Sequence, residues 1–304
     1  MSSSSVMETL SSELASIAER TSGTVVGVHA GGRMPTSGIE WRKGIVVTAD
    51  HAIRREAEIK VIGADGKTVS ATLAGRDSST DLAVLKIVES GNAVADLGES
   101  TGLKLGQMVL ALGRSRRGNL VASAGIIGGL SGDWRSPRGG LLAQHIRLDL
   151  SLYPGFSGGP LVNGQGKIVG VNTRGLAPGR AVTIPILTAN RVVDELLEKG
   201  HIARAYLGLA MQPVAIPKTM RAKLKLGTTS GLLVMHVESE GPADKGGVLL
   251  GDVLTEIRGT ALEDWGAVQD LLASGKVGDS IAIRVIRGGE TVQLSVNLGD
   301  RPRR

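Results

Sequence analysis

The sequence of 304 residues contains no cysteine, and only 2% of its residues are aromatic. Without cysteine the chain forms no disulfide, has no thiol nucleophile and offers no thiolate to a metal. Because hydrophobic residues still make up 41% of the sequence, the core must consist mainly of aliphatic side chains. The β-branched members of that set favour strands, so the composition predicts a protein built largely from β-structure.

The sequence also has little charge imbalance and no long hydrophobic run. Basic residues exceed acidic ones by 35 to 29, and part of this excess gathers at Arg114, Arg116 and Arg117, which we expect to be solvated loop charges. Binding of single-stranded nucleic acid uses stacking rings, which are scarce here, so no nucleic-acid partner is predicted. No apolar run approaches the roughly 20 residues of a membrane-spanning helix.

The first 20 residues show no basic segment followed by an apolar one, as a secretory leader has. If Met1 is the native start, the sequence predicts a cytoplasmic protein. A start behind a removed leader is the alternative.

The N-terminal segment differs in pattern from the rest of the chain. Leu10, Leu14 and Ile17 recur at helical spacing behind Ser11 or Ser12 as a cap, which predicts a short amphipathic arm over residues 1–19. From Gly23 onward, short apolar runs alternate with turn signals, which is typical of a β-barrel or sandwich.

Further along, the Asp65-Gly66 pair predicts a hairpin turn. The stretch LTANRVVDELLEKG, residues 187–200, predicts a helix that Thr188 or Asn190 caps and that Gly200 ends. We expect this helix to close a first domain of residues 20–200. Residues 204–300 alternate strand and helix signals, the helices being in GPADKGGV and EDWGAVQDLLASG, and predict a small α+β domain.

The stretch YPGFSGGPLVN, residues 153–163, surrounds Ser157 with glycines. Serine chemistry needs a base and a group that orients the base. Among the five histidines, His51 follows an apolar strand and is the candidate base. Asp81 stands before the buried run LAVLKIV, where an unpaired carboxylate is costly, so it is the candidate orienting group. Asp50 and Asp77 are competitors that we expect to point to water.

Gly155 permits a positive φ, so the N–H groups of Gly155 and Ser157 can converge on one oxygen as an oxyanion hole. The chain order His, Asp, Ser differs from the orders of α/β-hydrolases and subtilisins. No histidine pair has the HExxH spacing of a zinc hydrolase, and no Gly-Lys-Ser/Thr motif for phosphate occurs, so the sequence predicts neither metal nor cofactor.

Three segments carry a family resemblance: TADHAI around His51, SSTDLAVLKI around Asp81, and LDLSLYPGFSGGPLVNGQGKIVGVNT around Ser157. They resemble the three blocks of the high-temperature-requirement (HtrA or Deg) proteases, which are trypsin-like enzymes followed by PDZ domains. The resemblance implies a mainly β fold, with a chymotrypsin/trypsin-like double barrel of six strands each and then an α+β PDZ domain. It also implies a catalytic triad of Ser157 as nucleophile, His51 as proton shuttle and Asp81 as orienting group.

The chain departs from the family pattern at the residue before the serine, where it has Phe156. This side chain either packs against the second barrel or disturbs the oxyanion hole. By the resemblance, Ser151 lies at the base of the specificity pocket and predicts small or medium apolar substrate side chains. Tyr153 and Arg174 shape the rim. Val171, Asn172, Thr173 and Arg174 are expected to pair with extended substrate as an added β-strand.

In the C-terminal domain, the segment Tyr206-Leu207-Gly208-Leu209 resembles a PDZ carboxylate-binding loop. Its backbone N–H groups are expected to bind a peptide C-terminus, with the following strand accepting the peptide. Val268 and Leu272, four residues apart on one helix, either face this groove or belong to the core.

The resemblance predicts a serine endopeptidase that cleaves unfolded or damaged protein without a cofactor. A catalytically inactive scaffold that binds peptides as a chaperone is the alternative, and Phe156 is its one support. A homotrimer is one assembly that the resemblance allows, although the arm before Gly23 lacks the aromatic residues that many family members use for it. Relatives are mostly exported, so the periplasm or cell envelope is the alternative location.

Overall fold

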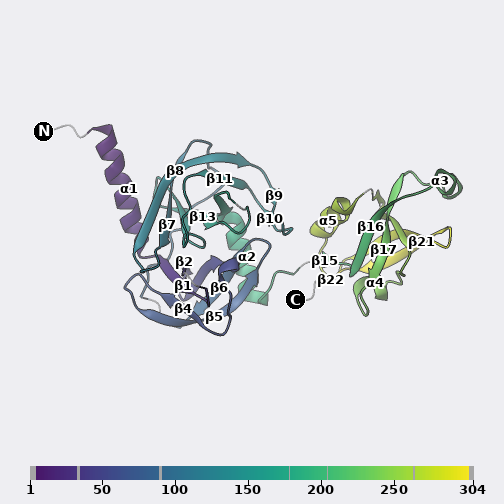
Figure 1. The fold of residues 1–304 in the computed structure, drawn as a ribbon, viewed down its shortest axis with the longest axis horizontal. Coiled ribbons are helices and arrows are strands. Elements are labelled where there is room, and N and C mark those ends of the chain that lie inside the picture. Colours follow the sequence, from purple (N-terminus) through teal and green to yellow (C-terminus); the bar gives the residue numbers. More distant parts are fainter. Residues whose placement is uncertain are drawn as a thin grey trace. The chain divides into compact units, whose positions relative to one another are not determined.

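The computed structural model divides the chain into two compact units, residues 1–202 and 203–304, and each unit has its own hydrophobic core (Figure 1). The structure describes residues 5–32, 35–88, 91–177, 179–203, 205–262 and 264–300. No helix in these ranges is both long enough and apolar enough to cross a membrane.

Helix α1 (Val6–Ser22) precedes the first strand. Its cap is Ser5, whose side chain accepts a hydrogen bond from the Glu8 N–H at 3.2 Å. The prediction of a cap at Ser11 or Ser12 is therefore wrong, because Ser5 has the extended backbone that a cap requires and the helix begins directly after it.

The first barrel contains six antiparallel strands in the closed order β1-β2-β3-β6-β5-β4. The strands are β1 (Val25–His29), β2 (Thr36–Arg42), β3 (Ile45–Ala49), β4 (Ile59–Ile62), β5 (Thr68–Asp77) and β6 (Leu82–Ile87). The predicted hairpin turn joins β4 to β5, with Gly66 at a φ of 80° and the Lys67 N–H donating to the Asp65 carboxylate at 3.0 Å. Aliphatic side chains fill the interior, as the scarcity of rings requires.

The second barrel is also closed by six strands, in the order β11-β14-β13-β12-β7-β8. The strands are β7 (Met108–Arg114), β8 (Leu120–Ser131), β11 (His145–Asp149), β12 (Pro160–Asn163), β13 (Ile168–Thr173) and β14 (Val182–Pro185). Between β8 and β11 the chain forms a small hairpin of β9 (Trp134–Arg135) and β10 (Leu141–Leu142). The prediction of two six-stranded barrels is confirmed.

Helix α2 (Ile186–Lys199) ends at Gly200, which has the predicted left-handed conformation with a φ of 73°. The predicted caps are wrong, because α2 begins at Ile186 and both side chains have other partners. Thr188 accepts a hydrogen bond from the Ala143 N–H at 2.9 Å, and Asn190 accepts one from the Trp41 indole at 3.0 Å. The buried apolar face of α2 joins aliphatic residues of both barrels in one core, which makes the two barrels a single unit.

The second unit is built on a sheet in the order β16-β17-β18-β20-β21. The strands are β16 (Leu209–Ala215), β17 (Ser230–Val237), β18 (Val253–Ile257), β19 (Thr260–Ala261), β20 (Ser280–Arg287) and β21 (Glu290–Asn297), with a separate pair of β15 (Ala205–Tyr206) and β22 (Gly299–Asp300). Helices α4 (Pro242–Lys245) and α5 (Trp265–Ser274) lie where helices were predicted, whereas α3 (Lys218–Leu224) was not predicted. The expected α+β character is confirmed.

Candidate active site

The pairing of β3 with β6 brings His51 to Asp81. Ala49 ends β3 opposite Leu82, which begins β6, so the residues just beyond these two strand ends meet. His51 lies on the short 3₁₀ turn η1 (Asp50–Ala52), and its Nδ1 is 2.8 Å from Asp81 Oδ2 and 3.0 Å from Oδ1. The His51 N–H donates to Asp81 Oδ1 at 2.9 Å. A fully buried carboxylate thus holds the imidazole by its Nδ1 edge.

Thr173, the last residue of β13, and Gly175, two residues further on, complete the surroundings of Asp81. The Thr173 hydroxyl donates to Asp81 Oδ2, so the side chain that was predicted to contact substrate is bonded to the candidate triad. Gly175 was not among the predicted site residues. A Cβ placed on it would lie 2.7 Å from His51 Nδ1 and even closer to the Asp81 carboxylate, so only glycine fits there without displacing the pair.

The two competing carboxylates do not point to water, and that prediction is wrong. Asp50 is 2% exposed and pairs with the Arg76 guanidinium, which also donates to the Asp50 carbonyl at 3.2 Å. Asp77 is buried too, and accepts hydrogen bonds from the hydroxyls of Ser79 at 2.9 Å and Thr80 at 2.7 Å. Both carboxylates brace the turns that carry His51 and Asp81.

Ser157 lies in a tight turn of the second barrel and is 6% exposed. Gly155 and Gly158 have φ values of 99° and 84°, which side chains rarely adopt. The Ser157 hydroxyl accepts a hydrogen bond from the Arg174 N–H at 3.3 Å. Between these described residues the structure has no hydrogen bond from Ser157 to His51. Because Thr173 contacts Asp81 and the adjacent Arg174 contacts Ser157, the end of β13 links the three candidate residues.

The turn leaves two backbone donors unused. The N–H groups of Gly155 and Ser157 donate to no other residue in the described part of the chain. The turn is held from outside, because the Ser37 hydroxyl donates to the Gly155 carbonyl at 2.6 Å and accepts from the Arg114 N–H at 2.8 Å. Free N–H groups on a braced turn are suited to bind a developing oxyanion.

Phe156 packs inside the second barrel. It is 1% exposed and belongs to the core of that barrel. Its ring lies 5.9 Å from that of Tyr153, and a Cβ added to Gly113 would approach Phe156 Cγ to 3.3 Å. The bulk of the side chain is therefore accommodated beside a glycine while Gly155 keeps its positive φ. Of the two predicted alternatives for Phe156, the structure therefore agrees with packing against the second barrel.

The residues predicted for substrate specificity fall into two groups. Ser151, Tyr153 and Arg174 are exposed, and their roles stay predictions. Val171 and Asn172 have no free strand edge, so strand addition by substrate is wrong at both positions. Val171 faces Pro160 on one side and Ile184 on the other, and the Asn172 backbone is bonded to the turn after Ser157.

Arg114 is not the solvated loop residue that was predicted. It is 8% exposed, and its guanidinium donates to the carbonyls of Ser22 and Val25 at 2.9 Å and of Gly118 at 3.2 Å. Burial lowers the pKa of this guanidinium from its ordinary value. The Arg114 side chain therefore links the end of α1 to β7. The Arg114 N–H donates to Ser37, which in turn supports the Ser157 turn.

In the second unit, the predicted carboxylate-binding loop has Gly208 at a φ of 76° between the buried Leu207 and the half-buried Leu209. The Tyr206 hydroxyl donates to Glu238. Val268 is fully buried in the core of the unit, which agrees with the second of its two predicted alternatives, whereas Leu272 is half-buried against the same core.

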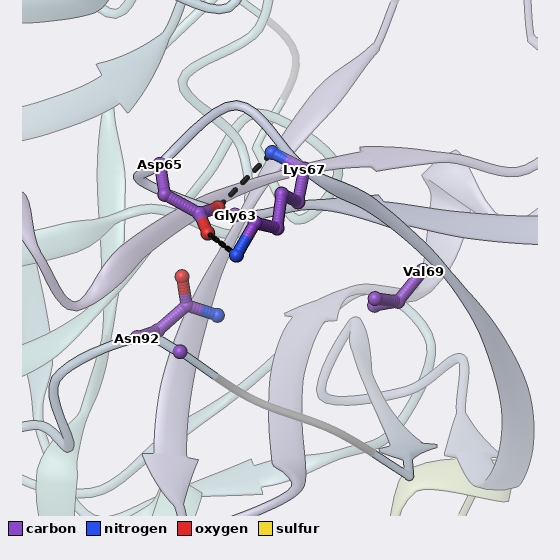
Figure 2. A pocket seen from close by; sticks show the side chains of 6 residues that line it. Gly63, Asp65, Lys67, Val69 and Asn92 are labelled. Atoms are coloured by element: carbon purple, nitrogen blue, oxygen red, sulfur yellow. Dashed lines mark hydrogen bonds and ion pairs between the residues drawn. The ribbon is translucent and has the colours of Figure 1, made fainter.

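A hollow of about 90 Å³ lies at the β4–β5 turn (Figure 2). It is lined by Gly63, Asp65, Lys67, Val69, Gly91 and Asn92. The figure shows Asp65 and Lys67 turned toward each other, and their side chains pair at 3.3 Å. None of the predicted catalytic residues lines this hollow. Within the described ranges, no three histidine, aspartate or glutamate side chains are grouped so that they could hold a metal ion.

Comparisons with known proteins agree with the observed fold. Residues 36–171 match the family model of the trypsin-like peptidase domain, and residues 205–298 match that of the PDZ domain. The chain is 36% identical over 270 residues to the serine protease Do-like HtrA of Lactobacillus helveticus, covering 84% of this chain and 65% of that protein. It is 31% identical to a probable periplasmic serine endoprotease, DegP-like, of Halomonas elongata, covering 85% of this chain and 55% of that protein. The chain thus spans less than two thirds of the length of these relatives.

Solved structures match over almost their whole length. The HtrA-type protease AlgW with a tripeptide is 31% identical, with a TM-score of 0.68, and the match covers 96% of this chain and 98% of that one. AlgW has also been solved with a decapeptide, where the TM-score is 0.72 and the identity 28%. The order of the two domains, the double barrel and these relatives show that the chain belongs to the HtrA family of trypsin-like serine proteases that carry a PDZ domain.

Proposed function

We propose that this protein is a serine endopeptidase that uses Ser157, His51 and Asp81 as its triad. The observation that carries the proposal is the buried Asp81 carboxylate held against His51 Nδ1, with the adjacent residues Thr173 and Arg174 joining Asp81 to Ser157. The family relatives are named serine proteases or endoproteases, which supports the same activity.

In the proposed reaction, His51 carries each proton that is transferred. With its Nδ1–H donated to Asp81, His51 presents an unprotonated Nε2 that can act as a base. The Ser157 oxygen accepts from Arg174, which leaves the hydroxyl proton free to be given to His51. The oxygen attacks the peptide carbonyl, and the protonated His51 then gives its proton to the leaving amine as the C–N bond breaks. Water, activated by His51, hydrolyses the resulting acyl-enzyme.

The N–H groups of Gly155 and Ser157 are the proposed oxyanion donors. Loss of one donor in such a site costs about 3 kcal/mol of transition-state stabilisation. The neutral Ser151 offers no counter-ion to a basic substrate side chain, so small or medium apolar side chains are the proposed preference. Unfolded or damaged proteins are the proposed substrates, since extended chain is needed to reach a serine on a tight turn.

The second unit is proposed to bind peptide C-termini at Tyr206–Leu209 and along β16, with Leu272 at the side of the groove. The structures of AlgW contain a tripeptide and a decapeptide, which supports peptide binding in this family. Such binding would select substrates or regulate the protease unit. Assembly into a homotrimer is proposed by family resemblance.

The names of the relatives favour another location than the one expected from the first 20 residues. The expectation of a cytoplasmic protein finds no support, since relatives from Halomonas elongata and Pseudomonas savastanoi are named periplasmic. We propose the periplasm or cell envelope as the place of action. Mapping the native N-terminus in fractionated cells tests this.

The activity is tested with chemically unfolded casein as substrate. The full chain is expected to cleave it and the Ser157→Ala variant to be inactive. Ser131→Ala, a change of an exposed serine on β8, is expected to retain full activity. Equal cleavage by the wild type and Ser157→Ala would contradict the proposal. A chain truncated after Ile202 lacks the PDZ unit. If it cleaved casein as fast as the full chain and selected substrates no differently, only the proposed role of the PDZ unit would be contradicted.

A further inference from the structure

Strand β16 has one paired edge and one open edge (Figure 1). It pairs with β17 along its whole length, and no other strand in the described residues pairs with it. In an antiparallel ladder, successive residues turn their N–H and C=O groups alternately toward the partner strand and away from it. The open edge therefore belongs to every second residue of β16.

Two hydrogen bonds at the ends of β16 identify those residues. The Glu238 N–H donates to the Gly208 carbonyl at 2.8 Å, and the Ile216 N–H donates to the Thr229 carbonyl at 3.0 Å. Even-numbered residues thus face β17 at both ends of the strand. The single register shift places its extra residue, Met235, on β17, so the alternation along β16 is not interrupted.

The open edge consists of Leu209, Met211, Pro213 and Ala215. Leu209 and Met211 are half-buried against the core of the unit, and α5 packs beside β16. Each of these two residues offers an N–H and a C=O to an added strand. Pro213 has no N–H, and its ring carbon occupies the place of the missing proton, where a peptide carbonyl would otherwise approach.

We propose that Pro213 limits backbone recognition by this PDZ unit to the last three residues of a peptide. The inference rests on the proposed function, in which the terminal carboxylate lies at the Tyr206–Leu209 loop. The terminal residue then pairs with Leu209, and the residue two before it pairs with Met211. The residue four before it meets Pro213, where the ladder loses a donor and the ring pushes the peptide away from β16.

The test uses the full chain with Ser157→Ala, so that no peptide is cleaved. N-acetylated peptides of three, five and seven residues, all ending in Ala-Leu-Val, are titrated calorimetrically. The three dissociation constants are expected to agree within about threefold. Adding Pro213→Ala restores the N–H donor and removes the ring. It is expected to leave the affinity for the tripeptide unchanged and to tighten binding of the seven-residue peptide about tenfold.

Gln212→Ala is the matched control, because Gln212 is an exposed neighbour whose backbone faces β17. It is expected to keep the length independence of the parent chain. Binding of the seven-residue peptide at least about tenfold tighter than the tripeptide, with the same ratio in Pro213→Ala, would overturn the inference. Absence of binding by every peptide to every variant would instead overturn the proposed PDZ function and the inference with it. The two failures are therefore distinguishable.

Discussion

The two sides of the proposed active site differ in how their polar groups are bonded. On the first-barrel side, Asp81 is bonded to His51 and also accepts a hydrogen bond from Thr173 of β13, and Asp50 pairs with Arg76. On the second-barrel side, the N–H groups of Gly155 and Ser157 donate to no described residue, and the Ser157 hydroxyl accepts one hydrogen bond of 3.3 Å. Groups that orient the base are satisfied in the free protein, whereas groups that must meet substrate are left open.

The second unit shows the same division. Asp252 is 1% exposed and accepts hydrogen bonds from Arg287 at 2.8 and 2.9 Å, whereas the outer edge of β16 is unpaired in the described residues. In both units, unpaired backbone groups lie at the places proposed to receive extended peptide.

The largest effect is expected from a change of Asp81, the carboxylate that orients His51. Asn fits the backbone of residue 81, whose φ is 59°, because asparagine tolerates the left-handed region. Asp81→Asn leaves the shape of the side chain but no longer favours the Nδ1–H tautomer of His51. Casein cleavage is expected to fall about 10³–10⁴-fold with the fold intact. The control is Asp65→Asn at the β4–β5 turn, and activity of Asp81→Asn near that of this control would contradict the assigned role.

Gly175→Ala tests the packing around Asp81 and His51 without changing a charge. The added methyl group would displace Asp81 or His51, and a misplacement of about 1 Å can cost about 100-fold in rate. Gly132→Ala is the matched control, since a Cβ at Gly132 meets nothing within 4 Å. Equal peptide-hydrolysis rates for the two variants would show that the packing at Gly175 does not hold the pair.

Ser37→Ala tests whether the Ser37 hydroxyl holds the turn that carries Gly155 and Ser157. The change removes the bonds to the Gly155 carbonyl and from the Arg114 N–H, so the turn with the proposed oxyanion donors loses a support. We expect kcat to fall about tenfold with little change in KM, because such donors act mainly in the transition state. The control is Ser100→Ala, a buried serine whose hydroxyl has no hydrogen-bond partner among the described residues. A rise in KM at constant kcat would contradict this role.

The smallest expected effect is on the stability of the second unit, through the pair of Asp252 and Arg287, as the pH is lowered. Burial alone would raise the pKa of the Asp252 carboxyl, but hydrogen bonds from Arg287 and the Leu249 N–H outweigh it and hold the pKa below its ordinary value. A lowered folded-state pKa gives stability that is complete above the unfolded value of about 3.9 and is lost as the pH falls through the folded value.

Differential scanning calorimetry of the melting of the second unit should therefore show a loss of about 1–2 kcal/mol on acidification below pH of about 4. In Asp252→Asn, the same stability should already be missing at neutral pH, and the acid-dependent loss should be smaller. An equally steep acid response in this variant would show that other carboxylates determine it.

Local sequence pattern was enough to predict many of the individual elements. Turn residues and short aliphatic runs predicted the strands, and the glycines around Ser157 have the backbone conformations that their positions require. The resemblance added the pairing of strands into two barrels. The polar residues brought together by distant segments were less predictable. Asp50 finds its partner Arg76 26 positions away, and nothing near either residue signals the pair.

Two wrong predictions and one omission share one physical cause. Arg114 was predicted to be a solvated loop charge beside Arg116 and Arg117, yet it is buried and donates to three backbone carbonyls. Asn172 was expected at a free strand edge, yet the turn after Ser157 occupies that edge. Gly175 was one glycine among 44, and only its contact with Asp81 and His51 distinguishes it. Each depends on tertiary contacts that composition and periodicity do not encode.

The most direct measurement is covalent labelling of the intact protein with a fluorophosphonate, followed by mass spectrometry of its peptides. A serine made nucleophilic by an oriented histidine is expected to carry the label, and the adduct should map to Ser157 alone. His51→Ala and Asp81→Asn should slow labelling by orders of magnitude. A folded protein that takes no label at Ser157, or takes it as fast in His51→Ala as in the wild type, would contradict the account.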